Sequence, residues 1–143
     1  MSSTRERANW LERHREVVRE IRPDQADAEA KVRLAERNLE RARSHAEVDP
    51  DLALVAAESA LVNLADAILA DDGFRLRGKT GSHEARFSHP GLPRGFREHS
   101  ALIAAARKGR NTALYDTAGA VAPSFVTEVT RVVNVLLEQV RNR

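Results

Sequence analysis

The sequence has no cysteine and few aromatic residues, and each shortage excludes a class of protein. Without cysteine there can be no disulfide framework, no thiolate zinc site and no cysteine nucleophile, and a reducing compartment, the cytoplasm, is expected. Four Phe, one Tyr and one Trp among 143 residues leave core packing to Leu, Val, Ile and Ala. No apolar run approaches the roughly 18 residues of a membrane span, and the first residues lack the apolar core of a signal peptide. We therefore expect a soluble protein that is not exported.

Charge is unevenly distributed along the chain although the formal net charge is only +2. Residues 51–72 carry five acids and no base, whereas residues 73–110 carry nine Arg or Lys and only two acids, a local balance of +7. Such asymmetry predicts an anionic partner, either nucleic acid or an acidic protein. The alternative is that the basic segment docks on the acidic helix before it.

Helical periodicity predicts two amphipathic helices in the first third of the chain. Apolar residues recur at helical spacing from Arg5 to Ile21, and Pro23 should end that helix. Asp24 can cap the next helix, in which apolar residues step by three and four as far as Ala46. We expect this second helix to pack along one neighbour.

Two further helices have strong start signals. Asp49-Pro50 combines a capping side chain with proline at the first helical position, so a helix should run over 50–72. It is apolar nearly all round and must be buried. We expect its acids Glu58 and Asp66 to lie at a rim or to pair with arginine. Pro123 should open the final helix, 123–141, which has a strong apolar face.

The segment 73–95 holds five of the seven glycines and reads as a long basic loop, either functional or disordered. A helix should begin near Phe96 and continue to about Ala118. No alternating segment suggests a sheet. The predicted class is all-α: an up-and-down four-helix bundle in residues 23–143, preceded by an N-terminal accessory helix in residues 1–22.

The stretch from Arg107 to Asp116 is the candidate functional site because a basic cluster runs directly into polar residues and a tyrosine. On a continuous helix Arg107, Asn111 and Tyr115 would share one stripe, with Arg110 beside it. This would give a cationic groove wall with a hydroxyl at one end. The alternative is a solvated helix end whose basic residues favour the C-terminal dipole.

Two other kinds of site are rejected. The segment 73–80 fits the spacing of a phosphate-binding P-loop, but it follows a helix, and no parallel sheet is predicted to hold a nucleotide. The five histidines lack the close pairing with acidic companions that a zinc site requires. We expect neither a metal nor another cofactor.

Residues 24–141 resemble the HEPN superfamily of small helical-bundle proteins. The resemblance is carried by the two long helices, the basic loop with Gly81-Ser82-His83, and Arg110-Asn111 before a last amphipathic helix. Many HEPN proteins are metal-independent ribonucleases, often toxins or defence proteins, which act as homodimers with arginines and histidines lining a shared cleft. Their signature places a His four to six positions after the Arg, but here the fifth position is Tyr115.

The resemblance implies a catalytic set of Arg110, Asn111 and Tyr115. RNA contacts are expected from four further side chains: Arg107, Lys108, His83 and Arg97. A tyrosine with an ordinary pKa near 10 is a poor base, so phosphate binding should survive the substitution better than cleavage. His83 would supply an imidazole if the fold brings it to Arg110.

Two other interpretations stay open. In one, the protein is a non-enzymatic module whose helices 50–72 and 123–141 pair with a protein partner such as a nucleotidyltransferase-like antitoxin. In that case Arg107 and Arg110 would meet acidic protein in place of RNA. In the other, the protein is a structural bundle without a ligand.

Overall fold

The computed structural model describes residues 3–143, so the first two residues of the predicted accessory segment 1–22 lie outside the described residues. The chain is mostly helical, which confirms the all-α class. The helices are α1 (Thr4–Arg13), α2 (Gln25–His45), α3 (Pro50–Asp72), α4 (Ser82–Phe87), α5 (Arg94–Glu98), α6 (Ser100–Asn111) and α7 (Pro123–Arg141). A π-helical turn η1 (Thr112–Asp116) and two strands, β1 (Val18–Glu20) and β2 (Phe74–Leu76), complete the fold.

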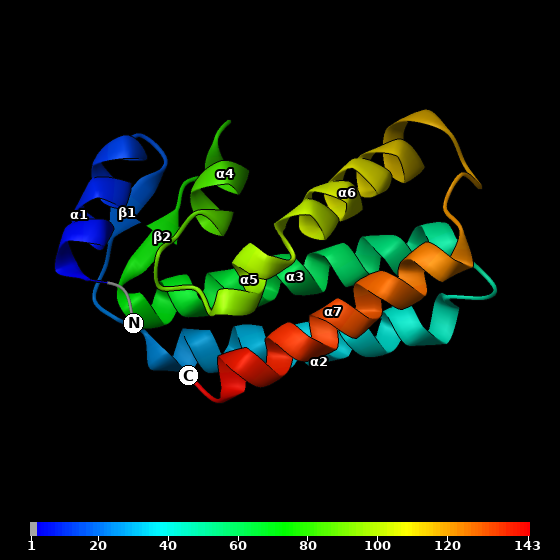
Figure 1. Cartoon of the computed structure of the whole chain (residues 1–143), viewed down its shortest axis with the longest axis horizontal. Coiled ribbons are helices and arrows are strands. Elements are labelled where there is room, and N and C mark those ends of the chain that lie inside the picture. The colour runs from blue at the N-terminus through cyan, green and yellow to red at the C-terminus, as the bar shows by residue number, and fades with distance from the viewer. Residues whose placement is uncertain (1–2) are drawn as a thin grey trace.

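Helix α3 is the centre of the molecule. Helices α2 and α7 pack along it, while α4 and α6 lie over it on the side away from α2 (Figure 1). Both described termini lie at the same end of the molecule, close to the end of α3. On the side of α4 and α6, α3 also contacts β2 and η1.

The bounds of α3 are those predicted, because both ends are stopped by specific residues. Asp49 accepts a hydrogen bond from the backbone N–H of Leu52 at 3.2 Å, and Pro50 occupies the first turn. Gly73 ends the helix with φ +89°, a left-handed conformation that glycine adopts without strain. Helices α2 and α7 also follow their predicted ranges to within a residue.

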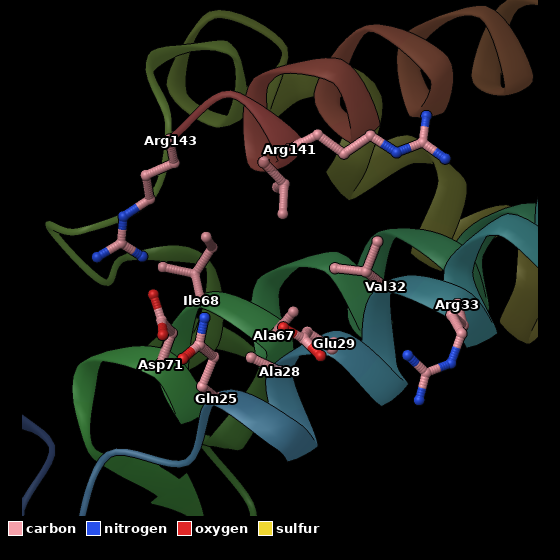
Figure 2. A pocket seen from close by; sticks show the side chains of 11 residues that line it. Gln25, Ala28, Glu29, Val32, Arg33, Ala67, Ile68, Asp71, Arg141 and Arg143 are labelled. Carbon is pink, nitrogen blue, oxygen red and sulfur yellow. The ribbon is translucent and has the colours of Figure 1, made fainter.

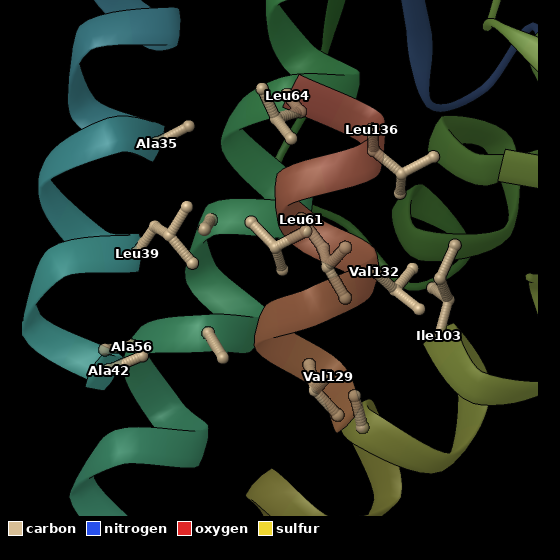
Figure 3. Close-up of a cluster of buried hydrophobic side chains, with 14 of the residues drawn as sticks. Ala35, Leu39, Ala42, Ala56, Leu61, Leu64, Ile103, Val129, Val132 and Leu136 are labelled. Atoms are coloured by element: carbon tan, nitrogen blue, oxygen red, sulfur yellow. The ribbon is translucent and has the colours of Figure 1, made fainter. Parts of the chain in front are cut away.

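The main core is aliphatic, as the shortage of aromatic residues requires. Leu61 and Leu64 of α3 interdigitate with Leu39 of α2 and with Val132 and Leu136 of α7 (Figure 3). Phe96 is the one aromatic residue that is fully part of this cluster in the described chain. By length and apolarity α3 would suffice to cross a membrane, contrary to the expectation that no run comes close, but 61% of its apolar window is buried in this core.

The predicted N-terminal helix was too long. Helix α1 ends at Arg13, and the following residues turn into β1, which pairs antiparallel with β2 in the register Val18 to Leu76. Around this pair a second core forms from Trp10, Val17, Val18, Leu69 and Ala85. The N-terminal segment is therefore packed into the molecule and is not an appendage.

The segment 73–95 is not one long loop, contrary to the prediction from its glycines. It contains β2 and α4, and α5 begins at Arg94. The prediction of no sheet was also wrong. Strands β1 and β2 have three residues each and pair across more than fifty residues of chain. Three residues are too few for an alternating apolar pattern to be recognised in the sequence.

The single helix predicted from Phe96 to about Ala118 is divided in three. Helices α5 and α6 are separated at His99, and the π-helical turn η1 replaces the end of the helix. A π-helix has more residues per turn than an α-helix. The stripe expected to join Arg107, Asn111 and Tyr115 is therefore not continued regularly through η1.

Gly109 allows α6 to approach α3 closely. A Cβ atom at this position would lie 2.8 Å from the Cδ2 atom of the buried Leu54. We expect Gly109→Val to lower the free energy of unfolding by about 1–3 kcal/mol, the usual cost of overpacking. Urea denaturation would measure the change. Gly78→Val is the control, since a Cβ at Gly78 meets nothing within 4 Å, and an equal loss in both variants would contradict the close approach.

Candidate anion-binding site

A group of five charged or titratable side chains converges where α4 and α6 lie over α3. We call it the Glu58 cluster, and its members are Glu58, His83, Arg86, Arg107 and Arg110. Helical periodicity places Glu58 on the face of α3 that also carries Asp66, two turns later. Helix α4 supplies His83 and Arg86, and α6 supplies the other two arginines.

Arg110 is paired with the acidic helix. Its Nε atom lies 3.4 Å from Oε2 of Glu58, whose side chain is only 7% exposed, whereas the Arg110 side chain is 33% exposed. Within the described residues the buried Nε has no aligned hydrogen-bond acceptor, so the contact is an ion pair without a hydrogen bond through Nε. The Arg110 guanidinium thus contacts a buried carboxylate while part of the side chain stays exposed to solvent.

Arg86 makes the second contact between the basic segment and α3. Its Nε donates a hydrogen bond of 2.7 Å to Oδ1 of Asp66, and both side chains are largely buried. The prediction that Glu58 and Asp66 pair with arginine is therefore confirmed. The basic segment does dock on the acidic helix, as the alternative interpretation of its charge proposed.

Docking uses only part of the positive charge. Of the nine basic residues in 73–110, Arg75, Arg86, Arg94 and Arg110 have an acid within 4 Å in the described chain. The remaining five are exposed and form no ion pair among residues 3–143: Arg77, Lys79, Arg97, Arg107 and Lys108. A surplus of exposed cations therefore remains in this segment.

Burial raises the pKa of the Glu58 carboxyl above its usual range. The positive charges of Arg110, Arg107 and Arg86 lower that pKa but do not outweigh the loss of hydration. The folded protein therefore binds a proton at Glu58 more readily than the unfolded chain does. Ionisation of Glu58 therefore lowers the stability of the folded protein.

His83 is a neutral imidazole at neutral pH. Burial, with the charges of Arg107 and Arg86, lowers its pKa to about 4. Its ring packs on Phe87 at a centroid distance of 4.8 Å, and its Nδ1 atom is buried without a hydrogen-bond partner in the described chain. An unprotonated imidazole beside guanidinium groups can accept a proton once an anion offsets their charge.

The fold brings together three of the residues predicted from sequence and leaves the others apart. Arg107, Arg110 and His83 belong to the Glu58 cluster. Asn111 and Tyr115 are exposed, Tyr115 to 76%, and their side chains form no hydrogen bond among the described residues.

The two remaining predicted residues lie in other hollows. Lys108 borders an apolar hollow of about 400 Å³ with Gly109 and Phe125. Arg97, on α5, lines a hollow near Arg143. Neither hollow includes a member of the Glu58 cluster.

Sequence reasoning missed two members of the cluster. The sequence predicts Glu58 only as an acid at a rim or paired with arginine, and Arg86 is not among the residues predicted for the site. The sequence feature that points to these two residues is an acidic helix followed by a basic segment. This feature indicates that the two segments are in contact, but it does not indicate which side chains pair.

A separate hollow lies near the C-terminal end of α3, between α2, α3 and the end of α7 (Figure 2). Val32 and Ile68 face into it, and Arg143 lies over Asp71 at its edge. Among residues 3–143 no group of three or more His, Asp or Glu side chains is arranged to hold a metal ion. The Glu58 cluster, with its three arginines, is the arrangement best suited to an anion.

Comparisons with known proteins do not extend this description. No family model, no curated protein and no solved structure matches the chain.

Proposed function

We propose that this chain is a HEPN-like RNA-binding protein in which the Glu58 cluster holds RNA phosphates. Helices α2, α3, α6 and α7 would then be its four-helix bundle. The observation that carries the proposal is the exposed guanidinium of Arg107, which has no acidic partner in the described chain and lies within electrostatic range of a neutral imidazole and a buried carboxylate.

Charge and chemistry favour a phosphate in this cluster. Arg86, Arg107 and Arg110 carry three positive charges, against the two negative charges of Glu58 and Asp66. A guanidinium group presents a planar set of donors that matches phosphate oxygens. The exposed Arg77 and Lys79 precede α4, so a chain with repeated phosphates can reach further cations.

The same arrangement also supports RNA cleavage without a metal. A phosphate held by Arg107 offsets the charges that depress the pKa of His83, so its imidazole becomes a better base. His83 would take the proton of a 2′-hydroxyl group, whose oxygen attacks the adjacent phosphorus while the 5′-oxygen leaves with a proton. Tyr115 is exposed on η1, outside the Glu58 cluster, so the leaving 5′-oxygen would take its proton from water.

Salt-dependent binding tests the phosphate contacts. We expect Arg107→Gln to weaken binding of single-stranded RNA about threefold to tenfold and to reduce the slope of log K against log salt by about 0.7, the value of one lost phosphate contact. Fluorescence anisotropy at several salt concentrations would measure both. Arg37→Gln is the matched control, because Arg37 is exposed on α2, across α3 from the cluster, and has no ion pair in the described chain.

Two results would oppose the proposal. Absence of RNA binding by the wild-type protein at low salt would remove it. Equal RNA decay in preparations of wild type, His83→Asn, Arg110→Ala and Tyr115→Phe would assign the cleavage to a contaminant or to another site.

A protein partner is the second candidate, favoured by one observation. Four of the exposed large apolar side chains lie on two adjoining segments: Val48, Leu52, Leu114 and Tyr115. The N–H of Gly119, just beyond η1, donates a hydrogen bond to Asp51 at 2.7 Å and holds these segments together.

The apolar faces of α3 and α7 are buried in the core, so these helices cannot offer them to a partner. A partner would instead contact the exposed apolar side chains at this end of the molecule. Both a second copy, as in a homodimer, and an antitoxin protein fit this chemistry. Size-exclusion chromatography of Leu114→Ser should show a loss of any dimer formed by the wild type.

A further inference from the structure

Helix α4 carries two members of the Glu58 cluster although it has only six residues. A helix of this length is unstable in isolation, because the cost of nucleation is not recovered by so few hydrogen bonds. Its N-cap, Gly81, also has no side chain to cap the first turn. The position of His83 and Arg86 must therefore depend on contacts with other elements.

The N-terminal segment provides the buried contact. Trp10 of α1 is completely buried, and its indole Nε1 donates a hydrogen bond of 3.0 Å to the backbone carbonyl of Ala85. Ala85 lies between His83 and Arg86 in the chain and is itself fully buried. Trp10 is thus attached to the backbone of α4 directly between the two cluster residues.

The same segment contacts the residues on both sides of α4. Before the helix, the N–H of Arg77 donates to the carbonyl of Val17 at 2.8 Å, and the hydroxyl of Ser82 donates to the carbonyl of Arg77. After the helix, the hydroxyl of Ser88 lies 3.3 Å from Nε2 of His14. The N-terminal segment therefore contacts α4 directly and is also linked to both of its ends.

We propose that Trp10 is a positioning residue of the RNA site, and that the segment Thr4–Glu20 holds α4 so that His83 lies beside Arg107 and Arg86 lies beside Glu58. The role in RNA binding rests on the proposed function, whereas the role in placing His83 does not. Among residues 3–143 this segment has its own core, to which α3 contributes only Leu69. Changes at Trp10 can therefore displace α4 while the core between α2, α3 and α7 stays intact.

The test is Trp10→Phe, which removes the indole donor and keeps an aromatic ring. NMR titration of the histidine Hε1 resonances, assigned with His83→Asn, reports the surroundings of His83. We expect the His83 midpoint to rise from about 4 toward the ordinary value of 6.5, because a displaced α4 exposes the ring and moves it from Arg107. RNA affinity should fall about threefold to tenfold if the cluster binds phosphate.

Leu39→Val is the matched control for a general loss of stability. Leu39 is buried in the main core, on α2, and the substitution should lower Tm without moving the His83 midpoint. Val17→Ala is a milder change in the same cluster as Trp10 and serves if Trp10→Phe does not fold.

Two outcomes separate this inference from the proposed function. An unchanged His83 midpoint in folded Trp10→Phe or Val17→Ala would overturn the positioning role, whatever the RNA affinity. A shifted midpoint in a protein whose wild type binds no RNA would support the placement of α4 and reject the RNA site.

Discussion

Replacing Glu58 with glutamine is expected to strengthen RNA binding about fivefold while leaving the free energy of unfolding no lower than in the wild type. The substitution removes the one negative charge within the Glu58 cluster and keeps a side chain of nearly the same shape. Removing a like charge about 5 Å from a bound phosphate is worth about 1 kcal/mol when solvent screens the pair with a dielectric near that of water. A gain in affinity of this kind should diminish as salt is raised.

The stability part of this prediction follows from the sign of the pKa shift. The pKa of Glu58 is raised by burial, so the folded state binds the proton more tightly than the unfolded state. The contribution of Glu58 to the free energy of unfolding therefore falls as pH rises from 4.5 through the folded pKa, and the ionised form is the less stable one at pH 7. Glutamine imitates the protonated form, so the variant should also lose this pH dependence.

Arg110→Ala should do the opposite. It removes a cation from the cluster and leaves the buried Glu58 without its nearest ion-pair partner. Breaking a fully buried pair costs about 3–5 kcal/mol, but Arg110 is one third exposed, so about 1–2 kcal/mol is expected after solvent screening. RNA affinity should fall together with stability.

The double variant Glu58→Gln, Arg110→Ala separates the two effects. It should recover most of the stability lost in Arg110→Ala, because the unpaired carboxylate is gone, while its RNA affinity stays below that of Glu58→Gln. Urea denaturation and RNA titration of the wild type, the two single variants and the double variant give a double-mutant cycle for stability and for RNA affinity. Weaker RNA binding by Glu58→Gln than by wild type would show that the carboxylate supports the site, for instance by orienting Arg110.

The long helices could be predicted from sequence because their signals are local. Asp49 and Pro50 begin α3, Gly73 ends it, and each acts on backbone groups within four residues. The same holds for Asp24, which accepts a hydrogen bond from the N–H of Asp27 at 2.9 Å at the start of α2. Such signals need no knowledge of the rest of the fold.

The segment between α3 and α6 could not be predicted because its structure depends on distant residues. Strand β2 exists because β1 lies beside it, and α4 is fixed by Trp10, which is 75 residues from Ala85 in sequence. A turn signal such as Gly81-Ser82 gives no indication of either contact. The basic and acidic composition indicated that this segment meets α3, but only the fold pairs Arg110 with Glu58.

The position of Tyr115 could not be predicted from sequence for a different reason. Its predicted place beside Arg107 and Asn111 assumed a continuous α-helix, and the π-helical turn η1 changes the rotation per residue just before it. No residue type specifies a π-helical turn, so the change could not be read from sequence. His83, in contrast, was placed only conditionally from sequence, and its proximity to Arg107 comes from the packing of α4.

The largest loss of stability is expected from Asp72→Asn. The Asp72 side chain is 5% exposed and accepts hydrogen bonds from Nε2 of His89, at 2.7 Å, and from Arg143, while a guanidinium nitrogen of Arg7 lies 3.5 Å away. This carboxylate therefore joins the end of α3 to α1, to the C-terminal residue and to the loop before α5. We expect the variant to lose about 2–3 kcal/mol, the cost of breaking a buried pair discounted for the partial exposure of both arginines.

The dependence of this loss on pH gives a sharper measurement. Burial opposes ionisation of Asp72, but the hydrogen bonds from His89 and Arg143 and their charges together lower its pKa below 3.8. A lowered folded pKa means that the stabilisation is complete above the unfolded pKa and is lost as pH falls through the folded value. Asp72→Asn should therefore differ most from wild type near neutral pH and least in strong acid.

Asp71→Asn is the matched control, since Asp71 is the exposed neighbour and forms no ion pair among the described residues. Burial lowers the pKa of His89, which is therefore expected to stay neutral and to donate through Nε2–H to Asp72. In the Asn variant that donor can still reach the amide oxygen, so the loss should come mainly from the arginine contacts. Equal Tm values for Asp71→Asn and Asp72→Asn at pH 7 would show that these contacts contribute nothing to stability, and that the two cores alone hold the ends of the chain together.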